Sequence, residues 1–444
     1  MMMTNIWHTA PVSALSGEIT ICGDKSMSHR ALLLAALAEG QTEIRGFLPC
    51  ADCLATAQAL RALWVDIQRE KEIVTIRGVG FLGLQPPKAP LNMQNSGTSM
   101  RLLAGILAAQ RFESVLCGDE SLEKRPMQRI ITPLVQMGAK IVSHSNFTAP
   151  LHISGRPLTG IDYALPLPSA QLKSCLILAG LLADGTTRLH TCGISRDHTE
   201  RMLPLFGGAL ETQKEQIIVT GGQKLHGCVL EIVGDLSAAA FFMVAALIAP
   251  RAEVVIRNVG INPTRSAIIT LLQKMGGRIE LHHQRFWGAE PVADIVVYHS
   301  KLRGITVAPE WIANAIDELP IFFIAAACAE GTTFVGNLSE LRVKESDRLA
   351  AMAQNLQTLG VACDVGADFI HIYGRSDRQF LPARVNSFGD HRIAMSLAVA
   401  GVRAAGELLI DDGAVAAVSM PQFRDFAAAI GMNVGEKDAK NCHD

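Results

Sequence analysis

Aromatic side chains are scarce in this chain of 444 residues: they make up 5% of it, whereas hydrophobic residues make up 49%. The core is therefore expected to consist of aliphatic side chains. A chain of this length has room for about two to four domains, each large enough to bury its own core.

The chain also lacks an excess of charge of either sign. Lys and Arg together number 40 and Asp and Glu 42, so the formal net charge is -2. Nucleic-acid-binding proteins usually carry a basic excess. We therefore expect no nucleic-acid partner, and any basic cluster should serve a small ligand.

No apolar run reaches the roughly 20 residues that a membrane span needs. The longest, at residues 238–249, is interpreted as a buried helix. The N-terminal stretch MMMTNIWHTAPV lacks the apolar segment of a signal peptide and is short for a transit peptide. We expect no membrane partner, a cytoplasmic location and a monomer.

The ten cysteines show no disulfide-framework spacing, which favours reduced thiols. Cys50 and Cys53 form one C-x-x-C pair, but a single pair is weak evidence for zinc or redox chemistry. His198 and Glu200 do not form an H-E-x-x-H motif, so a structural histidine is favoured. No metal and no cofactor are expected.

One local pattern occurs six times at intervals of roughly seventy residues. A short polar head precedes an apolar helical run, then a turn and a short β-type segment. The heads begin at Gly23, Asn95, Pro168, Gly234, Asp317 and Phe388. A helix N-terminus with free N–H groups is a natural anion site. The repeated head therefore indicates a multiply charged anionic ligand.

Between the heads lie amphipathic helices that end at a glycine and are followed by short strands. The repeat is thus predicted to be βαβαββ. Runs such as AAAFFMVAALIA have almost no polar face and must be buried on all sides. The predicted fold is an inside-out α/β barrel in two domains, with helices inside and sheets outside.

Six repeats divide most simply into two sets of three. We predict one lobe from residues 23–234 and a second from 1–22 and 235–444. The strand at 14–22 is expected to pair with the second half. The chain would then cross twice between lobes, which permits closure over an interdomain cleft that holds the active site.

The first head, Gly23-Asp24-Lys25-Ser26, is not a Walker A motif because Asp24 stands where Gly must precede the Lys. Lys25, Ser26 and Arg30 nevertheless place two cations and a hydroxyl at one helix start. Cations there oppose the helix macrodipole, which favours a functional interpretation over a solvated helix end.

Further cations follow in the second and third heads. Arg101 lies one turn after Gly97, where a ligand could approach the backbone closely. Arg125 precedes a proline, as in many ordinary helix starts. Ser169 to Lys173 open the third head, and Ser195-Arg196 follow its strand.

The second half supplies the acids. Asp317 begins an apolar helix, where a carboxylate is also a favourable N-terminal charge. In LRVKESDRL, Lys344 and Arg348 are like charges at i and i+4, an unfavourable pair that suggests a nearby anion. Glu345 lies between them, and Arg392 heads the last apolar helix. Carboxylates beside lysine are suited to proton transfer.

In this order, the motifs GDKSMSHR, NSGTSMR, EKRPM, PSAQLKS, SRDHTE, RVKESDR and GDHR resemble the 5-enolpyruvylshikimate-3-phosphate (EPSP) synthases. The resemblance covers about residues 13–434. GDKS, SAQLK, RDHTE and NPTR are similar to the second class of that family. The resemblance implies transfer of the enolpyruvyl group of phosphoenolpyruvate to the 5-hydroxyl of shikimate 3-phosphate, with release of phosphate and without a cofactor.

The resemblance also implies a role for each matching residue. For shikimate 3-phosphate these are Lys25, Ser26, Arg30, Ser169, Ala170, Gln171, Ser195, Arg196, Asp317 and Lys344. For phosphoenolpyruvate they are Lys25, Gly97, Arg125, Gln171, Arg348 and Arg392. Asp317 and Glu345 are implied as proton-transfer groups, with Lys25 assisting.

The chain departs from the family pattern at a few positions. Residues 416–421 contain no Lys where many relatives have one, so a phosphoenolpyruvate contact is missing or supplied elsewhere. Ala170 replaces a second Ser, and Glu340 stands where others carry Asn. Gly97 is where glyphosate would also bind, and the sequence leaves sensitivity to it open.

Two other interpretations compete. A UDP-N-acetylglucosamine enolpyruvyl transferase would share the fold, but it typically has Lys-Asn where this chain has Lys25-Ser26, and the residues between Cys117 and Arg125 do not match its loop. An RNA-end-processing enzyme or a non-catalytic anion-binding module is disfavoured by the acidic balance and by the acids Asp317 and Glu345.

Overall fold

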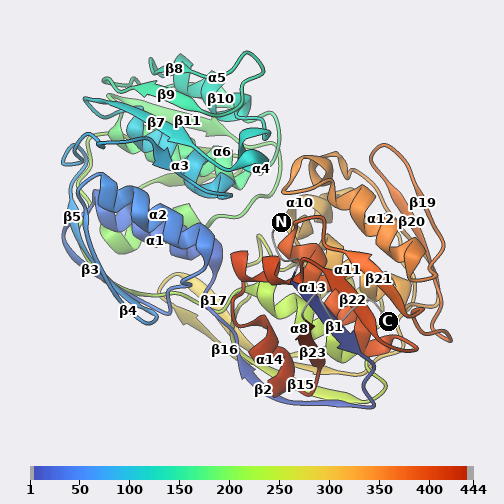
Figure 1. Cartoon of the computed structure of the whole chain (residues 1–444). Coiled ribbons are helices and arrows are strands. Elements are labelled where there is room, and N and C mark those ends of the chain that lie inside the picture. The colour runs from blue at the N-terminus through green and yellow to red at the C-terminus, as the bar shows by residue number, and fades with distance from the viewer. Residues whose placement is uncertain (1–4, 438–444) are drawn as a thin grey trace. The chain divides into compact units, whose positions relative to one another are not determined.

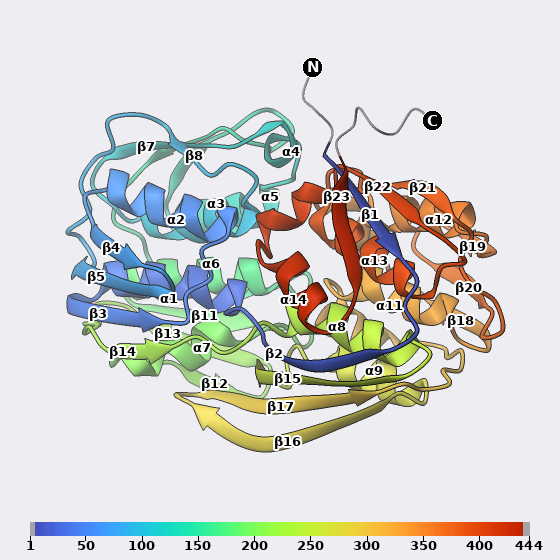
Figure 2. The same cartoon turned by 60° about the horizontal axis from the view of Figure 1, so that its bottom comes forward.

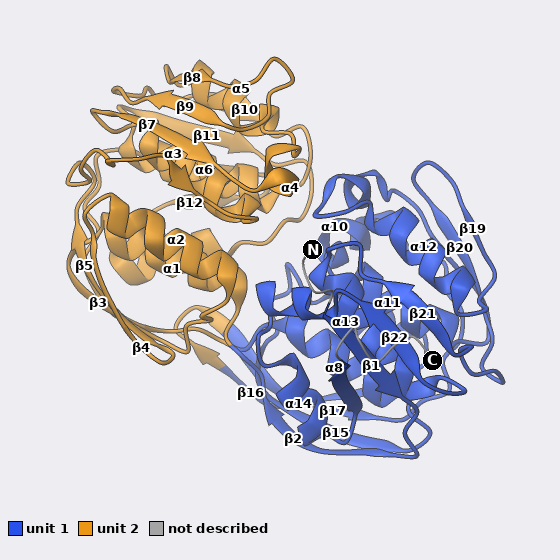
Figure 3. Cartoon of the chain, viewed as in Figure 1, with its two compact units in different colours: residues 1–22, 234–285, 291–444 blue, residues 23–233, 286–290 orange. Residues whose placement is uncertain are grey.

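The structure is a computed structural model that describes residues 5–437. It divides into two compact units (Figure 3). Unit 2 comprises residues 23–233 and 286–290, and unit 1 comprises the described residues up to 22, 234–285 and from 291 onward. Residues 286–290 correct the predicted division, which had assigned them to the lobe that corresponds to unit 1.

Unit 2 is built from three sheets and three inner helices (Figures 1 and 2). The inner helices are α1 (Lys25–Leu37), α3 (Gly97–Leu107) and α6 (Ala170–Leu182). In spatial order the first sheet is β14 (Val229–Glu231), β3 (Glu39–Arg45), β5 (Ile73–Val79) and β4 (Asp66–Glu70). The second is β6 (Leu91–Asn92), β7 (Glu113–Cys117), β9 (Leu151–Ser154) and β8 (Lys140–Val142). The third is β10 (Asp162–Ala164), β11 (Thr186–His190), β13 (Gln216–Thr220) and β12 (Glu211–Gln213).

Unit 1 repeats this plan. Its inner helices are α8 (Leu236–Ile248), α11 (Leu319–Ala327) and α13 (His391–Ala400). One sheet is β16 (Arg278–Trp287), β17 (Glu290–Tyr298), β15 (Ala252–Gly260) and β2 (Leu15–Thr20). The others are β18 (Gly331–Val335), β20 (Ile370–Gly374) and β19 (Cys363–Val365), and β21 (Ala383–Asn386), β22 (Leu408–Asp411), β1 (Ile6–Ala10) and β23 (Asn433–Lys437).

A second helix follows the inner helix and its strand in each repeat. In unit 2 these are α2 (Ala51–Ala62), α5 (Gln128–Gln136) and the short α7 (His198–Met202) with the 3-10 turn η1 (Leu203–Phe206). In unit 1 they are α9 (Ala267–Lys274), α12 (Arg348–Thr358) and α14 (Phe423–Ala429). The remaining short helices are α4 (Glu120–Glu123), η2 (Pro309–Trp311), α10 (Ile312–Ala315), η3 (Ser339–Val343), η4 (Gly401–Arg403) and η5 (Gly413–Val418).

The strands that begin the repeats explain how the chain joins its units. β14 pairs in parallel with β3, and β2 pairs in parallel with β15. β2 completes a sheet of unit 1, and the chain then enters α1 of unit 2. β14 completes a sheet of unit 2, and the chain then enters α8 of unit 1. The predicted pairing of 14–22 with the second half is confirmed. The prediction missed β1, which lies between β22 and β23.

The inner helices are buried because their sequences offer almost no polar face. All 13 residues of α8 are buried. The three inner helices of unit 1 contact one another, and in unit 2 α3 contacts both α1 and α6. Helices therefore form the centre of each unit and sheets its outside, as predicted.

The polar heads place capping side chains at the starts of these helices. Asp24, Ser96, Ser169, Asp235 and Asp390 each accept a hydrogen bond from a backbone N–H of the helix that they precede. In five of the six heads the chain itself thus satisfies one of these N–H groups. That the heads also bind an anion stays a prediction.

Among residues 5–437, no helix is long and apolar enough to cross a membrane.

Candidate active site

Lys25 is the first residue of α1, and its Nζ lies 3.0 Å from Oδ2 of Asp52 in the first turn of α2. Both side chains are largely buried. The cation at this helix start is thus offset by a carboxylate from the neighbouring helix, which relieves the conflict with the macrodipole. Sequence reasoning missed Asp52 because nothing local pairs it with Lys25.

Arg30 lies one turn further along α1 and is 3% exposed. Its guanidinium donates to the Ser26 carbonyl oxygen (2.9 Å) and to the hydroxyls of Ser174 and Thr199 (2.7 Å each). These bonds join α1 to α6 and α7. They also fix the backbone at Ser26, next to Lys25.

The heads of α3 and α6 meet at Gln171. The Gln171 amide oxygen accepts from Arg101 Nη1 (2.5 Å), and its amide nitrogen donates to Thr98 Oγ1 (3.0 Å). Arg101 Nη2 also donates to the Pro126 carbonyl oxygen (3.2 Å). Three segments that the sequence singled out separately therefore converge: 97–101, 125–126 and 169–171.

Gly97 begins α3 against two guanidinium groups. A Cβ at this position would lie 3.0 Å from Arg101 Nη1 and 3.3 Å from Arg125 Nη1. Arg125 is 6% exposed and donates to Asn95 Oδ1 and to Ser121 Oγ. The missing side chain at Gly97 thus allows both arginines to approach the helix start.

A chain of hydrogen bonds fixes these heads from inside unit 2. His29 Nδ1 bonds Thr56 Oγ1 (2.8 Å), and Thr56 Oγ1 bonds Ser99 Oγ (2.6 Å). Burial, and then the charges of Lys25 and Arg30, hold the pKa of His29 well below its usual value. A neutral imidazole adds no further positive charge to a region that already holds several cations.

The Ser195–Arg196 segment is held from two sides. Lys173 Nζ donates to the Ser195 carbonyl oxygen (3.1 Å) and lies 2.6 Å from Glu200 Oε1. His198 Nδ1 lies 2.6 Å from Glu290 Oε1, and both side chains are buried. His198 therefore pairs with Glu290 rather than Glu200. Sequence reasoning gave no role to Lys173 or Glu290.

In unit 1, Arg348 is surrounded by carboxylates although it is 1% exposed. Its guanidinium atoms lie 2.8 Å from Asp390 Oδ2, 2.6 Å from Glu345 Oε2 and 3.3 Å from Asp317 Oδ1. Burial alone would lower the pKa of Arg348, but attraction to the carboxylates of Asp390, Glu345 and Asp317 outweighs it and raises the pKa. Arg348 thus stays charged and holds Asp317 and Glu345 near each other.

Two further cations contact the same acids. Lys344 Nζ lies 3.5 Å from Asp317 Oδ1, and Arg392 Nη1 donates to the Asp317 carbonyl oxygen (2.8 Å). The carboxylate of Asp317 in the same unit thus lies beside both of the like charges Lys344 and Arg348. That they also bind an anionic ligand stays a prediction.

A buried cluster at the start of α8 adjoins Arg392. Arg265 donates to Asp235 Oδ1 (2.9 Å) and to Ser237 Oγ (2.7 Å). Ser237 in turn donates to Glu318 Oε1, which lies 3.8 Å from Arg392 Nη1. Sequence reasoning used Arg265 only as part of a class motif. Its role here is to hold the heads of α8 and α11 together.

The remaining motifs add no group of metal ligands. Cys50 precedes α2 and Cys53 lies in its first turn, and both are buried free thiols. Within the described part of the chain, no three His, Cys, Asp or Glu side chains are placed to hold a metal ion. The first half of the Lys-free stretch, residues 416–418, lies in η5, which contacts α13.

Comparison with known proteins identifies the family of the chain. The family model of EPSP synthase (3-phosphoshikimate 1-carboxyvinyltransferase) matches residues 9–426. The chain is 98% identical to a 3-phosphoshikimate 1-carboxyvinyltransferase of Dichelobacter nodosus, over 100% of both chains. It is 49% identical to one of Pelobacter propionicus, over 93% of this chain and 96% of the relative.

Solved structures show the same fold. EPSP synthase from Acinetobacter baumannii superposes with a TM-score of 0.87 at 45% identity, covering 98% of this chain and 100% of that one. The enolpyruvyl transferase NikO from Streptomyces tendae has a TM-score of 0.81 at 17% identity, covering 98% of this chain and 100% of that one, which shows a likeness of fold alone. The chain belongs to the EPSP synthase (3-phosphoshikimate 1-carboxyvinyltransferase) family.

Proposed function

We propose how the residues described above carry out the reaction of this family. The chain is an enolpyruvyl transferase of the shikimate pathway: it transfers the enolpyruvyl group of phosphoenolpyruvate to the 5-hydroxyl of shikimate 3-phosphate and releases phosphate. The identity of 98% over the whole length supports this reaction. The product is 5-enolpyruvylshikimate 3-phosphate, the precursor of chorismate and the aromatic amino acids.

Shikimate 3-phosphate is assigned to the heads of α1 and α6, the 195–196 segment, and the acid–lysine pair of unit 1. Its phosphate and carboxylate require cations, because charge-assisted hydrogen bonds are the strong ones. The proposed ligands are Lys25, Ser26, Arg30, Ser169, Ala170, Gln171, Ser195, Arg196, Asp317 and Lys344. Arg30 also fixes the backbone of Ser26, since its guanidinium donates to that carbonyl oxygen.

Phosphoenolpyruvate carries a second phosphate and carboxylate and needs its own cations. The proposed ligands are Lys25, Gly97, Arg125, Gln171, Arg348 and Arg392. In unit 2, Gly97, Arg125 and Gln171 already lie around Arg101. Arg101 is therefore proposed as a residue that positions these ligands. Its guanidinium donates to the amide oxygen of Gln171 and lies beside Gly97, where a side chain would begin.

The proposed proton-transfer groups are Asp317 and Glu345, with Lys25 assisting. Protonation of the methylene carbon of phosphoenolpyruvate leaves positive character on the adjacent carbon, which nearby carboxylates stabilise. The oxygen of the 5-hydroxyl then bonds to that carbon and gives its proton to one of the proposed groups. In the elimination the bond from that carbon to the phosphate oxygen breaks and phosphate leaves. The group that protonated the methylene carbon takes a proton back from the new methyl group, which restores the double bond.

One observation supports the acid–base assignment most directly: Asp317 and Glu345 both contact the buried guanidinium of Arg348. A shared cation fixes the positions of two neighbouring carboxylates, so both acids lie together at one place.

Phosphate release with different acceptors tests the proposed function. The purified chain is incubated with phosphoenolpyruvate and either shikimate 3-phosphate, shikimate or UDP-N-acetylglucosamine, and both phosphate and the enolpyruvyl product are measured. Equal amounts of phosphate and product are expected with shikimate 3-phosphate alone. Release with the nucleotide sugar, or phosphate without an enolpyruvyl product, would show that the assignment is wrong.

A cytoplasmic location is also proposed. Nine cysteines among the described residues are free, which is typical of a reducing compartment. Fractionation of the cells that express the chain tests this, and recovery outside the cytoplasm would contradict it. That the chain works as a monomer stays a prediction, which light scattering of the purified protein can check.

A further inference from the structure

The hairpin formed by β16 and β17 is longer than its counterparts. β16 has 10 residues, whereas the strands in the same place in the other sheets, β4, β8, β12, β19 and β23, have three to five. Most of the hairpin belongs to the sheet with β15 and β2 in unit 1. Its tip, residues 286–290, belongs to unit 2. The extra length therefore places the five residues 286–290 in unit 2, whereas the rest of the hairpin belongs to unit 1.

Two polar contacts attach the tip to the segment around α7. The Glu290 carboxylate accepts from His198 Nδ1 at 2.6 Å, with Glu290 and His198 each 1% exposed. The Ala289 carbonyl oxygen accepts from Arg201 Nη1 at 2.9 Å, and Arg201 Nε also donates to Asp197 Oδ2 at 2.9 Å. The tip thus contacts His198 directly and is linked to Asp197 through Arg201, and these two residues directly follow Arg196.

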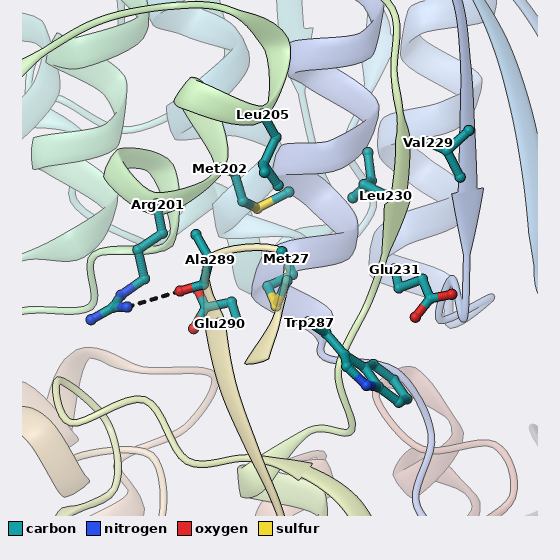
Figure 4. A pocket seen from close by; sticks show the side chains of 11 residues that line it. Met27, Arg201, Met202, Leu205, Val229, Leu230, Glu231, Trp287, Ala289 and Glu290 are labelled. Carbon is teal, nitrogen blue, oxygen red and sulfur yellow. Dashed lines mark hydrogen bonds between the residues drawn. The ribbon is translucent and has the colours of Figure 1, made fainter. Parts of the chain in front are cut away.

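Apolar side chains also lie beside the tip. A cavity of about 240 Å³ adjoins it (Figure 4). Figure 4 shows Trp287 on one side of the cavity and Met202, Leu205 and Leu230 on the other. Leu205 approaches the backbone of Gly288 closely, so apolar packing and the polar contacts of Ala289 and Glu290 both fix the tip.

A buried carboxylate is costly unless it is paired. Glu290 is paired with His198, which lies two residues after Arg196. Arg196 is a proposed ligand of shikimate 3-phosphate. On the other side of the same segment, Lys173 holds the Ser195 carbonyl oxygen. The segment 195–198 is therefore fixed at its start by α6 and at its end by the hairpin tip.

We propose that Glu290 is a positioning residue for shikimate 3-phosphate: through His198 it fixes the segment that presents Ser195 and Arg196. This rests on the proposed function of those two residues. Glu290 and His198 both belong to unit 2, so this contact lies within that unit. Glu290 itself touches no substrate.

The test measures the two substrates separately in the full chain. In Glu290→Ala, the dissociation constant for shikimate 3-phosphate should rise by about 10-fold or more, the scale expected when a positioning group is lost. The KM for phosphoenolpyruvate, measured at saturating shikimate 3-phosphate, should change by no more than about 2-fold. Glu290→Gln retains an acceptor for His198 Nδ1 and should recover most of the affinity. Glu280→Ala, an exposed acid on the same hairpin, is the matched control and should bind as the original chain does.

Three results would overturn the proposal. One is unchanged shikimate 3-phosphate binding in a folded Glu290→Ala variant. Another is an equal loss for both substrates together with a lowered Tm, which is what a purely structural residue would show. The third is a Glu290→Gln variant as weak as Glu290→Ala. If Glu290→Ala does not fold, His198→Phe, which removes the contact with Glu290 but keeps an aromatic ring, decides: weaker binding of shikimate 3-phosphate alone supports the proposal, and unchanged binding refutes it.

A separate variant distinguishes this proposal from the proposed function. Arg196→Ala should weaken shikimate 3-phosphate binding whatever Glu290 does. If Arg196→Ala binds normally, the role given to the 195–196 segment is wrong, and the inference about Glu290 falls with it. If Arg196→Ala binds weakly while Glu290→Ala binds normally, only the inference about Glu290 is wrong.

Discussion

Nη1 of Arg348 lies 3.3 Å from Oδ1 of Asp317, although Arg348 is almost completely buried. The same guanidinium contacts Glu345 at 2.6 Å. A buried arginine that contacts two carboxylates fixes their positions relative to each other. This pairing underlies the first prediction.

Asp317→Asn and Glu345→Gln keep the size of each side chain but remove the proton acceptor. Turnover should fall by roughly 10²–10⁴ in each, the usual share of general acid–base catalysis. Steady-state rates and circular dichroism are the measurements. Asp347→Asn is the matched control, because Asp347 caps α12 and asparagine caps a helix about as well. Near-normal turnover in both test variants would remove these acids from the mechanism.

Gly97→Ala tests the contact of α3 with two arginines. The new methyl group would lie 3.0 Å from Arg101 Nη1 and 3.3 Å from Arg125 Nη1, so both guanidinium ends must shift by a few tenths of an ångström. The KM for phosphoenolpyruvate should rise, and the inhibition constant for glyphosate, which is the longer molecule, should rise by a larger factor. Overpacking of this kind costs about 1–3 kcal/mol. If the KM for phosphoenolpyruvate and the inhibition constant for glyphosate rise by the same factor, Gly97 does not distinguish the two molecules.

Trp64 occupies a position that favours glycine. Five of the six second helices are followed by a glycine with positive φ, at Gly138, Gly207, Gly276, Gly360 and Gly431. After α2 the corresponding residue is Trp64, with φ of 71°. Left-handed backbone costs an L-residue roughly 1–2 kcal/mol.

Comparing Trp64→Gly with Trp64→Ala isolates that strain, because both remove the indole ring and its contact with Lys88. We expect Trp64→Gly to be more stable than Trp64→Ala by about 1 kcal/mol. At an unstrained position alanine would be the more stable of the two. Urea unfolding midpoints give the order, and an alanine variant at least as stable as the glycine variant would contradict the interpretation.

His29 predicts a pH dependence of stability. Its pKa in the folded chain lies well below the usual value, because of burial and then of Lys25 and Arg30. The unfolded chain, with a histidine pKa of about 6.5, therefore binds the proton more readily as pH falls. This contribution to stability is complete above about pH 6.5 and is lost progressively as pH falls toward the folded-state pKa.

His29→Asn should remove that contribution. Between pH 7 and 5 the free energy of unfolding should fall less steeply in the variant than in the original chain, by up to about 1.4 kcal/mol per pH unit. The comparison of slopes remains valid even if the variant is less stable at pH 7. Parallel pH profiles would mean that His29 titrates alike in both states.

The repeats and the inside-out arrangement could be predicted from the sequence because each depends on local pattern. Apolar runs without a polar face must be buried, and polar heads such as that of Asp24 mark helix starts. The helix-start residues Lys25, Gln171 and Arg392 could be found for the same reason.

The partners of those residues could not be predicted in this way. The role of Asp52 depends on its contact with Lys25 in another helix. The role of Glu290 depends on its contact with His198, which lies 92 residues earlier. Likewise, β1 lies between β22 and β23, and nothing in its own five residues indicates such distant neighbours. Contacts between remote segments depend on the assembled fold, which periodicity and capping do not describe.

The most direct test of the proposed mechanism is the reaction in D₂O, with the product examined by proton NMR and mass spectrometry. Protonation of the methylene carbon followed by proton loss from the resulting methyl group must exchange hydrogen at that carbon. We predict deuterium in the enolpyruvyl methylene group of the product, formed in equal amount with phosphate, and much slower formation of that product in Asp317→Asn and Glu345→Gln. A product without deuterium at that carbon, formed at the normal rate, would contradict the account.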